Sequence, residues 1–184
     1  QKHTVNTLAG FHTELYSYEY DDAYRQNFPS SDVTDMNGGS VVGMRNSGYT
    51  RELAMNSVFG RLKYNYMDKY LFEANARGDG SSRFAEGNRW GWFPSFSGAW
   101  RVTNEDFIQG TAFNEVVTDM KVRGSWGMLG NQQIGNDYYP YINTYATNAK
   151  YPFDNKVSGG AVQTENKIQD ISWEKTTTWG AAVD

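Results

Sequence analysis

Side chains that could bind a ligand are concentrated in residues 77–100, whose sequence is RGDGSSRFAEGNRWGWFPSFSGAW. This stretch holds three of the six tryptophans of the chain. An indole ring can stack on an apolar sugar face, and a guanidinium group supplies several planar hydrogen-bond donors. Arg83, Arg89 and Trp90 are therefore candidate contacts with a ligand or a protein partner.

The same stretch also has a structural interpretation, which we favour. Gly78, Asp79 and Gly80 suit a tight turn, because glycine and aspartate tolerate backbone conformations that other residues avoid. In that interpretation Arg77, Asp79 and Arg83 pair with one another, and the tryptophans hold strand ends at a membrane interface.

A second candidate ligand region covers residues 128–141, MLGNQQIGNDYYPY. Gly130 and Asn131 suit a turn. Polar side chains are common in loops, so a structural role is favoured here too. The side chains that could hydrogen-bond a glycan are Gln132, Gln133, Asn136 and Tyr138.

Catalytic chemistry has little support in the sequence. His3 and His12 are the only histidines, and their odd separation places them on opposite faces of a strand. The chain has no cysteine to act as a nucleophile. Glu14 and Glu73 are the only carboxylate pair that we can name for a glycoside hydrolase. We therefore expect no catalytic residue and no enzymatic activity.

Acidic residues gather at Asp21, Asp22 and residues 32–39. Their oxygens could bind calcium, but their spacing does not complete an EF-hand loop, and solvated loop charge is the favoured interpretation. We expect no metal and no cofactor. The net charge of −4, with both signs interspersed, also argues against a nucleic-acid partner.

The elements that must position these side chains are predicted to be strands, because apolar and polar residues alternate with a period of two. Aromatic residues make up 16% of the chain and recur on one face of this pattern, which includes Trp92 and Trp100. Only Trp90, with Arg83 and Arg89, is then left to meet a ligand. The six predicted strands cover residues 3–20, 56–66, 70–77, 91–102, 119–129 and 171–184.

The connections between these strands alternate in length. Residues 67–69 form a short turn, which predicts that Tyr66 faces Tyr70 and that Lys63 faces Glu73 across two antiparallel strands. Three longer connections fall at the opposite end, as in outer-membrane barrels. Residues 103–118 are the exception at the short-turn end and are predicted to hold a short helix, capped by Thr103 or Asn104.

No apolar run approaches the roughly 20 residues of a membrane-spanning helix. The mean hydropathy is −0.71. Strands that cross a bilayer escape this test, because their lipid-facing and lumen-facing residues average out. Since strand patterns reach both ends of the sequence, we expect a piece of a longer chain.

Three blocks carry a resemblance to a known family: FGRLKYNYMDKYLFEANARGDGSSRFAEGNRWGWFPSFSGAWRVTNEDF, KVRGSWGMLGNQQIGNDYYPY and WEKTTTWGAAVD. From about Ser57 to Asp184, with gaps in the loop between Pro152 and Asp170, the chain resembles the barrel of SusC/RagA-like TonB-dependent transporters of Bacteroides-type bacteria. Residues 21–50 carry no motif that we can place. The matched motif residues, expected to be mainly structural, are Arg77, Asp79, Gly80, Ser81, Ser82, Arg83, Phe84, Trp90, Gly91, Phe93, Pro94, Gly130, Asn131, Trp173 and Glu174.

The resemblance implies a protein of the Gram-negative outer membrane that imports oligosaccharides or peptides. It implies a 22-stranded barrel in contact with outer-membrane lipid, a plug domain, energy passed on by TonB through a missing N-terminal part, and a SusD-like lipoprotein lid. Residues 1–184 would supply part of that barrel only.

The expected fold is therefore all-β: an antiparallel up-and-down meander of about six strands, belonging to a transmembrane β-barrel with long loops at one end. A soluble β-sandwich that binds carbohydrate or mediates adhesion is the alternative, because the same aromatic face could pack into a core. Alternation alone does not separate the two folds.

Overall fold

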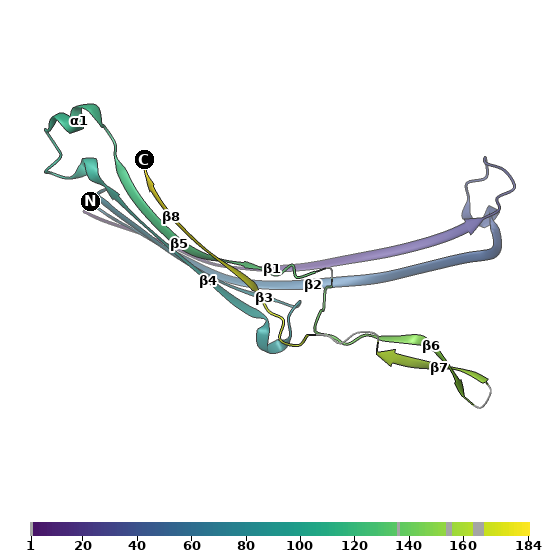
Figure 1. Ribbon diagram of the computed structural model, residues 1–184. Helices are drawn as coiled ribbons and strands as arrows, with labels where there is room; N and C mark the ends of the chain where they lie inside the picture. The colour runs from purple at the N-terminus through teal and green to yellow at the C-terminus, as the bar shows by residue number, and fades with distance from the viewer. Residues whose placement is uncertain (1, 136, 154–155, 164–167) are drawn as a thin grey trace. The chain divides into compact units, whose positions relative to one another are not determined.

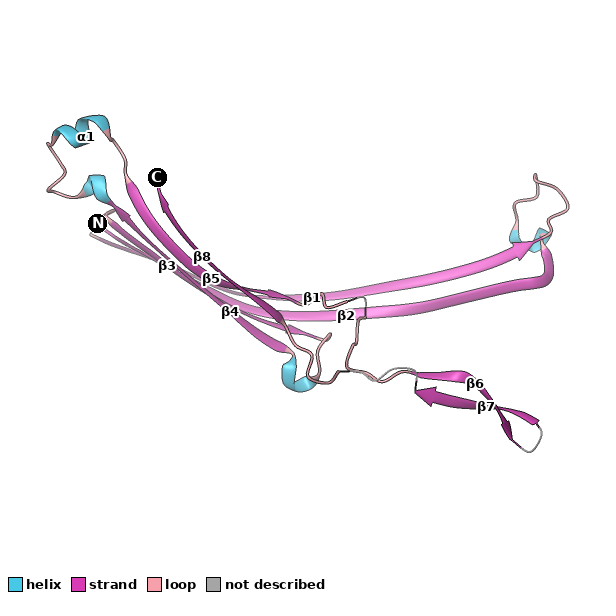
Figure 2. Ribbon diagram, viewed as in Figure 1, coloured by secondary structure: helices cyan, strands magenta, loops and turns pink. Residues whose placement is uncertain are grey.

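Strands dominate the computed structural model, which describes residues 2–135, 137–153, 156–163 and 168–184 (Figure 2). Six strands form one sheet in chain order, which confirms the predicted meander (Figure 1). The last four pairings, from β2–β3 to β5–β8, are antiparallel. The strands are β1 (His3–Gln26), β2 (Ser40–Tyr66), β3 (Tyr70–Ser81), β4 (Trp90–Arg101), β5 (Lys121–Asn131) and β8 (Glu174–Val183).

The chain divides into two compact units, which we describe separately. The first comprises Gln1–Glu14 and Ala54–Asp184, and the second comprises Leu15–Leu53. The second unit corrects the strand predictions, because β1 and β2 are 24 and 27 residues long. The sequence pattern predicts a loop for residues 21–26 and 40–55, which belong to β1 and β2 instead. Here tyrosine and arginine, rather than aliphatic residues, alternate with other polar residues, so an apolar pattern does not mark the strands.

The register between β2 and β3 is the predicted one. Tyr66 pairs with Tyr70 and Lys63 with Glu73. Met67 and Asp68 both have positive φ, of 53° and 56°, and Lys69 N donates to Tyr66 O, which makes a type I′ turn. This turn matches the twist of the strands and so specifies the pairing. A slip of one residue would move Lys63 onto the apolar face.

Two predicted turns are strands instead. Gly78, Asp79 and Gly80 lie within β3 and pair with both neighbours, so the prediction of a turn there was wrong. Glycine is needed at two of these positions because a Cβ atom would approach the Trp92 and Trp90 rings to 2.9 Å. These glycines make room for rings on the adjacent strand rather than bending the chain. Gly130 and Asn131, also predicted as a turn, end β5 and pair with Lys175 and Glu174.

The sheet of the first unit has one apolar and one polar face. Rows of apolar partners cross it, for instance Leu62, Ala74, Phe96, Trp126 and Trp179. This face is uncovered within the described residues: Trp179 is 83% exposed and Trp92 59% exposed. A β-sandwich would bury such a face under a second layer, so the described residues favour the barrel wall over the sandwich.

The remaining elements are short. A short helix is present within residues 103–118, as predicted: α1 covers Ala112–Val116. It starts later than predicted, because Thr111 and not Thr103 or Asn104 precedes it, and a 3₁₀ turn covers Val102–Asn104. A hairpin of β6 (Tyr145–Phe153) and β7 (Lys156–Gln163) occupies the long connection before the last predicted strand. Two further 3₁₀ turns cover Met36–Gly38 and Glu86–Asn88. Across the described ranges no helix is both long enough and apolar enough to span a bilayer.

Candidate functional site

A small buried cluster sits where β4 begins and where the chain enters β8. Phe84, Phe93 and Trp173 are the buried hydrophobic residues among those described, and the Trp173 ring lies 5.3 Å from that of Phe84 and 5.4 Å from that of Phe93. Trp173 Nε1 donates to the backbone carbonyl of Arg89 at 2.8 Å. The cluster therefore ties the segment before β8 to the β3–β4 loop, across 84 residues of sequence.

Ser81 and Ser82, which precede Arg83, shape this loop through their hydroxyl groups. Ser81 Oγ accepts a hydrogen bond from Arg83 N at 3.1 Å, and Ser82 Oγ accepts one from Ala54 N at 3.0 Å. Ser82 N in turn donates to Ala54 O at 2.9 Å. Both serines thus satisfy backbone donors that the end of the strand leaves unpaired.

Arg77 and Asp79 form the predicted ion pair, but Arg83 does not join it. Arg77 Nε lies 2.7 Å from Asp79 Oδ1, and Arg77 Nη2 donates to Ser57 Oγ at 3.0 Å. Arg83 is itself 7% exposed and donates from Nη1 to the carbonyl of Asp137 at 3.1 Å. Its position is corrected accordingly: Arg83 binds the backbone of the β5–β8 connection instead of Asp79.

Arg83 and Tyr138 are the two candidate ligand residues that the fold brings together. The guanidinium carbon lies 5.3 Å from the centre of the Tyr138 ring, within the range of a cation–π interaction. Arg83 Nε is buried and has no hydrogen-bond partner among the described atoms. The contact joins two loops that are 55 residues apart, so no local pattern in the sequence points to it.

Trp90 lies on the apolar face of the sheet together with Trp92. The prediction that Trp90, unlike Trp92, is left to meet a ligand is therefore wrong. The two tryptophans flank Gly91 in β4 and pack over Gly80 and Gly78 of β3, so they share the apolar face. Arg89 is exposed, and its Nε donates to Phe84 O at 3.3 Å. Arg83, Arg89 and Trp90 therefore do not form one binding surface.

The remaining candidates follow β5. Gln133 is exposed, and its backbone N donates to Asn131 Oδ1 at 2.9 Å. Asn131 Nδ2 donates to Glu174 Oε2 at 3.1 Å, which fastens the end of β5 to the start of β8. Gln132 Oε1 is buried and has no hydrogen-bond partner among the described atoms. Asn136 lies outside the described residues.

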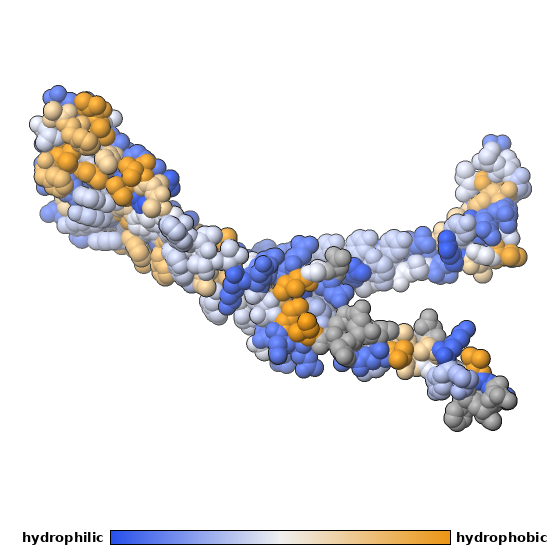
Figure 3. All heavy atoms as spheres, in the orientation of Figure 1, coloured by the Kyte–Doolittle hydropathy of each residue, from blue (hydrophilic) through white to orange (hydrophobic). Residues whose placement is uncertain are grey.

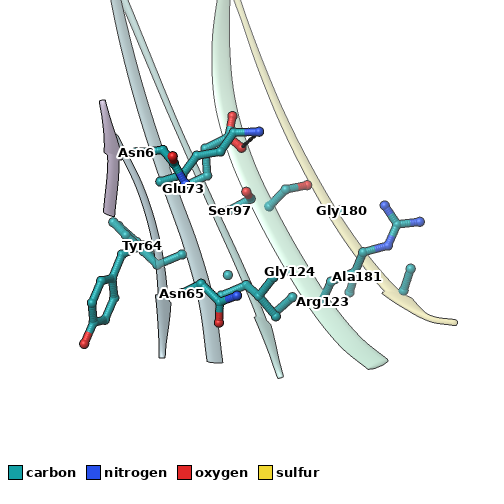
Figure 4. Close-up of a pocket in the computed structure, with 16 residues that line it drawn as sticks. Asn6, Tyr64, Asn65, Glu73, Ser97, Arg123, Gly124, Gly180 and Ala181 are labelled. Atoms are coloured by element: carbon teal, nitrogen blue, oxygen red, sulfur yellow. Dashed lines mark ion pairs between the residues drawn. The ribbon is translucent and has the colours of Figure 1, made fainter. Parts of the chain in front are cut away.

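The polar face of the first unit carries a hollow of about 570 Å³. The residues that line it come from all six strands of the sheet (Figure 4). Lys63 Nζ lies 3.1 Å from Glu73 Oε2, and Arg123 pairs with Asp184 at 3.0 Å. Each charged side chain that lines the hollow therefore has an oppositely charged neighbour. The polar side chains that line it are Asn6, Lys63, Asn65, Glu73, Ser97, Arg123 and Ser125.

The two carboxylates named for a hydrolase are engaged elsewhere. Glu73 contacts Lys63 and accepts a hydrogen bond from Asn75 at 3.1 Å, while Glu14 lies 3.7 Å from His12. Within the described ranges, no three His, Asp or Glu side chains gather as a metal site would require.

The second unit holds a surface that the sequence analysis did not identify, a stripe of tyrosine and arginine. Tyr18 and Tyr20 of β1 lie 6.1 and 5.2 Å from Tyr49 of β2, measured between ring centres. Arg51 lies 4.5 Å above the Tyr49 ring, and Arg45 lies 4.4 Å above that of Tyr24. The alternation YSYEY at residues 16–20 is the signal for this stripe in the sequence, and by itself it predicts no more than a strand. We call these residues, with Tyr16, the Tyr–Arg stripe.

Comparison with known proteins agrees with this geometry. The family model described as "TonB dependent receptor-like, beta-barrel" matches residues 2–184. The TonB-dependent receptor SusC of Bacteroides thetaiotaomicron is 40% identical over 142 residues, which is 75% of this chain and 14% of SusC. A TonB-dependent receptor of Formosa agariphila is 34% identical over 185 residues, covering 100% of this chain and 17% of the receptor.

A solved structure shares the fold across the whole chain. The structure of the RagAB peptide transporter superposes with a TM-score of 0.83 at 26% identity, covering 100% of this chain and 20% of the matched one. The chain thus spans less than a fifth of the length of these curated relatives. The relatives are receptors and transporters, not enzymes. The chain belongs to the TonB-dependent receptor-like β-barrel family of the outer membrane, as the SusC/RagA resemblance indicated.

Proposed function

We propose that this chain forms part of the barrel wall of an outer-membrane TonB-dependent transporter of the SusC/RagA type. The remaining strands, the plug domain and the segment that contacts TonB would lie outside these residues. The observation that carries the proposal is the continuous register of β2, β3, β4, β5 and β8, which gives the sheet one apolar and one polar face. Lipid on one side and water on the other require that division.

The dimensions of the apolar face support the same proposal. Tyr66, Tyr70 and Trp100 are cross-strand partners and form one aromatic row at the short-turn end. Trp92 lies eight residues before Trp100 on β4. At about 3.3 Å per residue the two tryptophans are roughly 26 Å apart along the strand, or about 20 Å across a bilayer for a strand tilted by about 40°. This is close to the apolar band of about 25 Å that aromatic girdles flank in outer-membrane barrels.

Cysteine labelling of the full-length transporter tests the assignment of faces. This chain has no cysteine, so each substitution adds a single thiol to it. Ser97→Cys and Ser125→Cys should react with a membrane-impermeant maleimide in outer-membrane vesicles, whereas Phe96→Cys and Trp126→Cys should be protected. Phe96 and Ser97 are adjacent in β4, and Ser125 and Trp126 are adjacent in β5, so each strand carries its own control. Equal labelling on both faces would contradict a lipid-facing surface.

We further propose that the whole protein imports an oligosaccharide or a peptide beneath a SusD-like lipoprotein. The SusC and RagAB relatives support this, since the RagAB structure is described as that of a peptide transporter. Uptake of fluorescent glycans and of fluorescent peptides by cells, with and without the transporter gene, would distinguish the two substrate classes. Uptake of neither would contradict the proposal.

The Tyr–Arg stripe is our candidate surface for the substrate or the lipoprotein. Tyrosine and arginine are the residues that most often dominate interfaces, and rings already stacked lose little conformational freedom on binding. Tyr49→Ala should therefore reduce uptake or lipoprotein binding, while Thr50→Ala, the adjacent exposed residue on the opposite face of β2, should not. Equal effects of both changes would contradict the assignment.

Two of the loop residues considered as ligand contacts remain candidates for that role, and two others position the loops. Arg89 and Gln133 have exposed side chains and could still contact a ligand. Arg83 and Tyr138 contact each other and so join the β3–β4 loop to the β5–β8 connection. Measuring the affinity of substrate for Arg89→Ala against that for Arg83→Lys would separate ligand contact from loop positioning.

A further inference from the structure

The connection between β4 and β5 is closed at its base. Val102 N donates to Met120 O at 2.8 Å, and Met120 N donates to the hydroxyl of Thr103 at 3.2 Å. Thr103 is 5% exposed, so these hydrogen bonds are shielded from water. The intervening residues 104–119 therefore form a compact loop with adjoining ends rather than a loose excursion.

Glu105 fastens the start of this loop to the apolar face of the sheet. Its carboxylate accepts hydrogen bonds from the Tyr70 hydroxyl at 2.7 Å and from Trp100 Nε1 at 3.0 Å. Tyr70 and Trp100 are cross-strand partners on the apolar face. Lys69 Nζ, 3.2 Å from Glu105 Oε2 and 2.9 Å from Asp106 Oδ1, completes the network. Glu105 is 8% exposed, so the loop begins beside the aromatic row and not over the polar hollow.

Each charged group in this network has an oppositely charged neighbour. Hydrogen bonds from Tyr70 and then Trp100 hold the pKa of the Glu105 carboxyl below its ordinary value. Hydrogen bonds to Asp106 and then Glu105 raise the pKa of Lys69. Both groups therefore stay ionised at neutral pH, and the anchor of the loop persists under physiological conditions.

Beyond this anchor the loop exposes large apolar side chains. Phe107, Phe113 and Val116 are 65%, 43% and 84% exposed. Figure 3 shows hydrophobic atoms gathered over α1 and the neighbouring end of the strands. Apolar side chains exposed together on a closed loop mark a surface that contacts another molecule. The loop also adjoins the aromatic row of Tyr66, Tyr70 and Trp100, which lies at the edge of the apolar face.

We propose that this loop is a membrane-interface anchor, with Phe107, Phe113 and Val116 inserted among the lipid headgroups and upper acyl chains at the short-turn end of the barrel. The inference rests on the proposed barrel function. Phenylalanine at the boundary between headgroups and acyl chains, with charged and polar side chains facing water, is the pattern of interfacial segments. A plug inside the barrel would meet the polar face instead, whereas Glu105 holds the loop beside Tyr70 and Trp100.

Fluorescence quenching in the full-length transporter, reconstituted in phosphatidylethanolamine/phosphatidylglycerol vesicles, tests the proposal. A fluorophore on Val116→Cys or Phe113→Cys should be quenched several-fold more by headgroup-proximal doxyl lipids than a fluorophore on Gln109→Cys, an exposed polar residue of the same loop. Quenching by aqueous iodide should show the reverse order. Full iodide quenching at position 116 without lipid quenching would overturn the proposal, and so would protection from both quenchers, which indicates a protein partner.

A mid-sheet control separates this inference from the proposed function. A fluorophore on Phe96→Cys should be quenched by lipids labelled deep in the acyl chains. If it is quenched and position 116 is not, the barrel assignment stands and the anchor is wrong. If neither is quenched by lipid, the barrel assignment itself fails.

Discussion

A lysine introduced at Phe96 should destabilise the protein far more than a lysine at Ser97. Phe96 lies four residues from Trp92 and four from Trp100, so it occupies the middle of the apolar band. Lysine at the midplane of a barrel's lipid face costs about 2–4 kcal/mol. At 1.4 kcal/mol for each factor of ten, Phe96→Lys should lower the folding equilibrium constant by roughly 30-fold to 1,000-fold.

Ser97 provides the matched control, because it is the next residue of β4 and lines the polar hollow. Its cross-strand partners are Glu73 and Ser125, and a carboxylate neighbour accommodates a new ammonium group. Ser97→Lys should therefore change the free energy of unfolding by no more than about 0.5 kcal/mol, as ordinary surface substitutions do.

Urea titration of the full-length protein from lipid vesicles would measure both variants, with the folded fraction followed by tryptophan fluorescence and by mobility of the unheated protein on a gel. The reasoning is refuted if the two lysines cost the same, or if Ser97→Lys is the more damaging. Either result would mean that the two faces are wrongly assigned.

Three further predictions concern the ends of the strands. Trp173→Ala should lower the free energy of unfolding by about 3–5 kcal/mol, as for other buried tryptophans, and should raise hydrogen exchange in the β3–β4 loop. Exchange as slow as in the wild type would contradict the role of Trp173 in the buried cluster. Gly91→Ala should lower the melting temperature, because its Cβ would meet the Trp173 ring at 2.9 Å. Gly87→Ala is the control, since a Cβ there would meet nothing within 4 Å. Equal melting temperatures of the two variants would contradict the prediction. The pKa of Glu105 is lowered in the folded protein, so its contribution to stability is complete above the ordinary value of 4.5 and is lost as the pH falls through the folded value. The protection factors of amide hydrogen exchange around Tyr70, which are corrected for the intrinsic pH dependence of exchange, should therefore fall on acidification. Glu105→Gln should remove that loss of protection, and protection that stays constant with pH in the wild type would contradict it.

Much of the sheet could be predicted because local patterns specify it. Tyr66 and Tyr70 flank a turn short enough to allow only one pairing, and every further β2–β3 pair follows from it. The outer parts of β1 and β2 could not be predicted in this way. Their strands are marked by tyrosine and arginine, as around Tyr49, and such residues fit a solvated loop equally well.

The candidate site was less predictable than the sheet. Gly78 and Gly80 carry the ordinary signal of a turn, but they lie in a strand because tryptophan rings on β4 need their space. The contact of Arg83 with Tyr138 joins loops that only the folded chain brings together. Trp90 was separated from Trp92 although alternation alone places both on one face, so the signal was present and was misjudged.

The sequence by itself determined the all-β class, the order of the strands, the register of β2 with β3 and the division into apolar and polar faces. These depend on side-chain period and short turns, which act over a few residues. Only the tertiary structure decided which residues meet in the buried cluster, which glycines lie under rings, and that Glu105 binds the loop after β4 to Tyr70 and Trp100. Those contacts join residues up to 84 positions apart, and their partners are set by the packing of the sheet rather than by any local pattern.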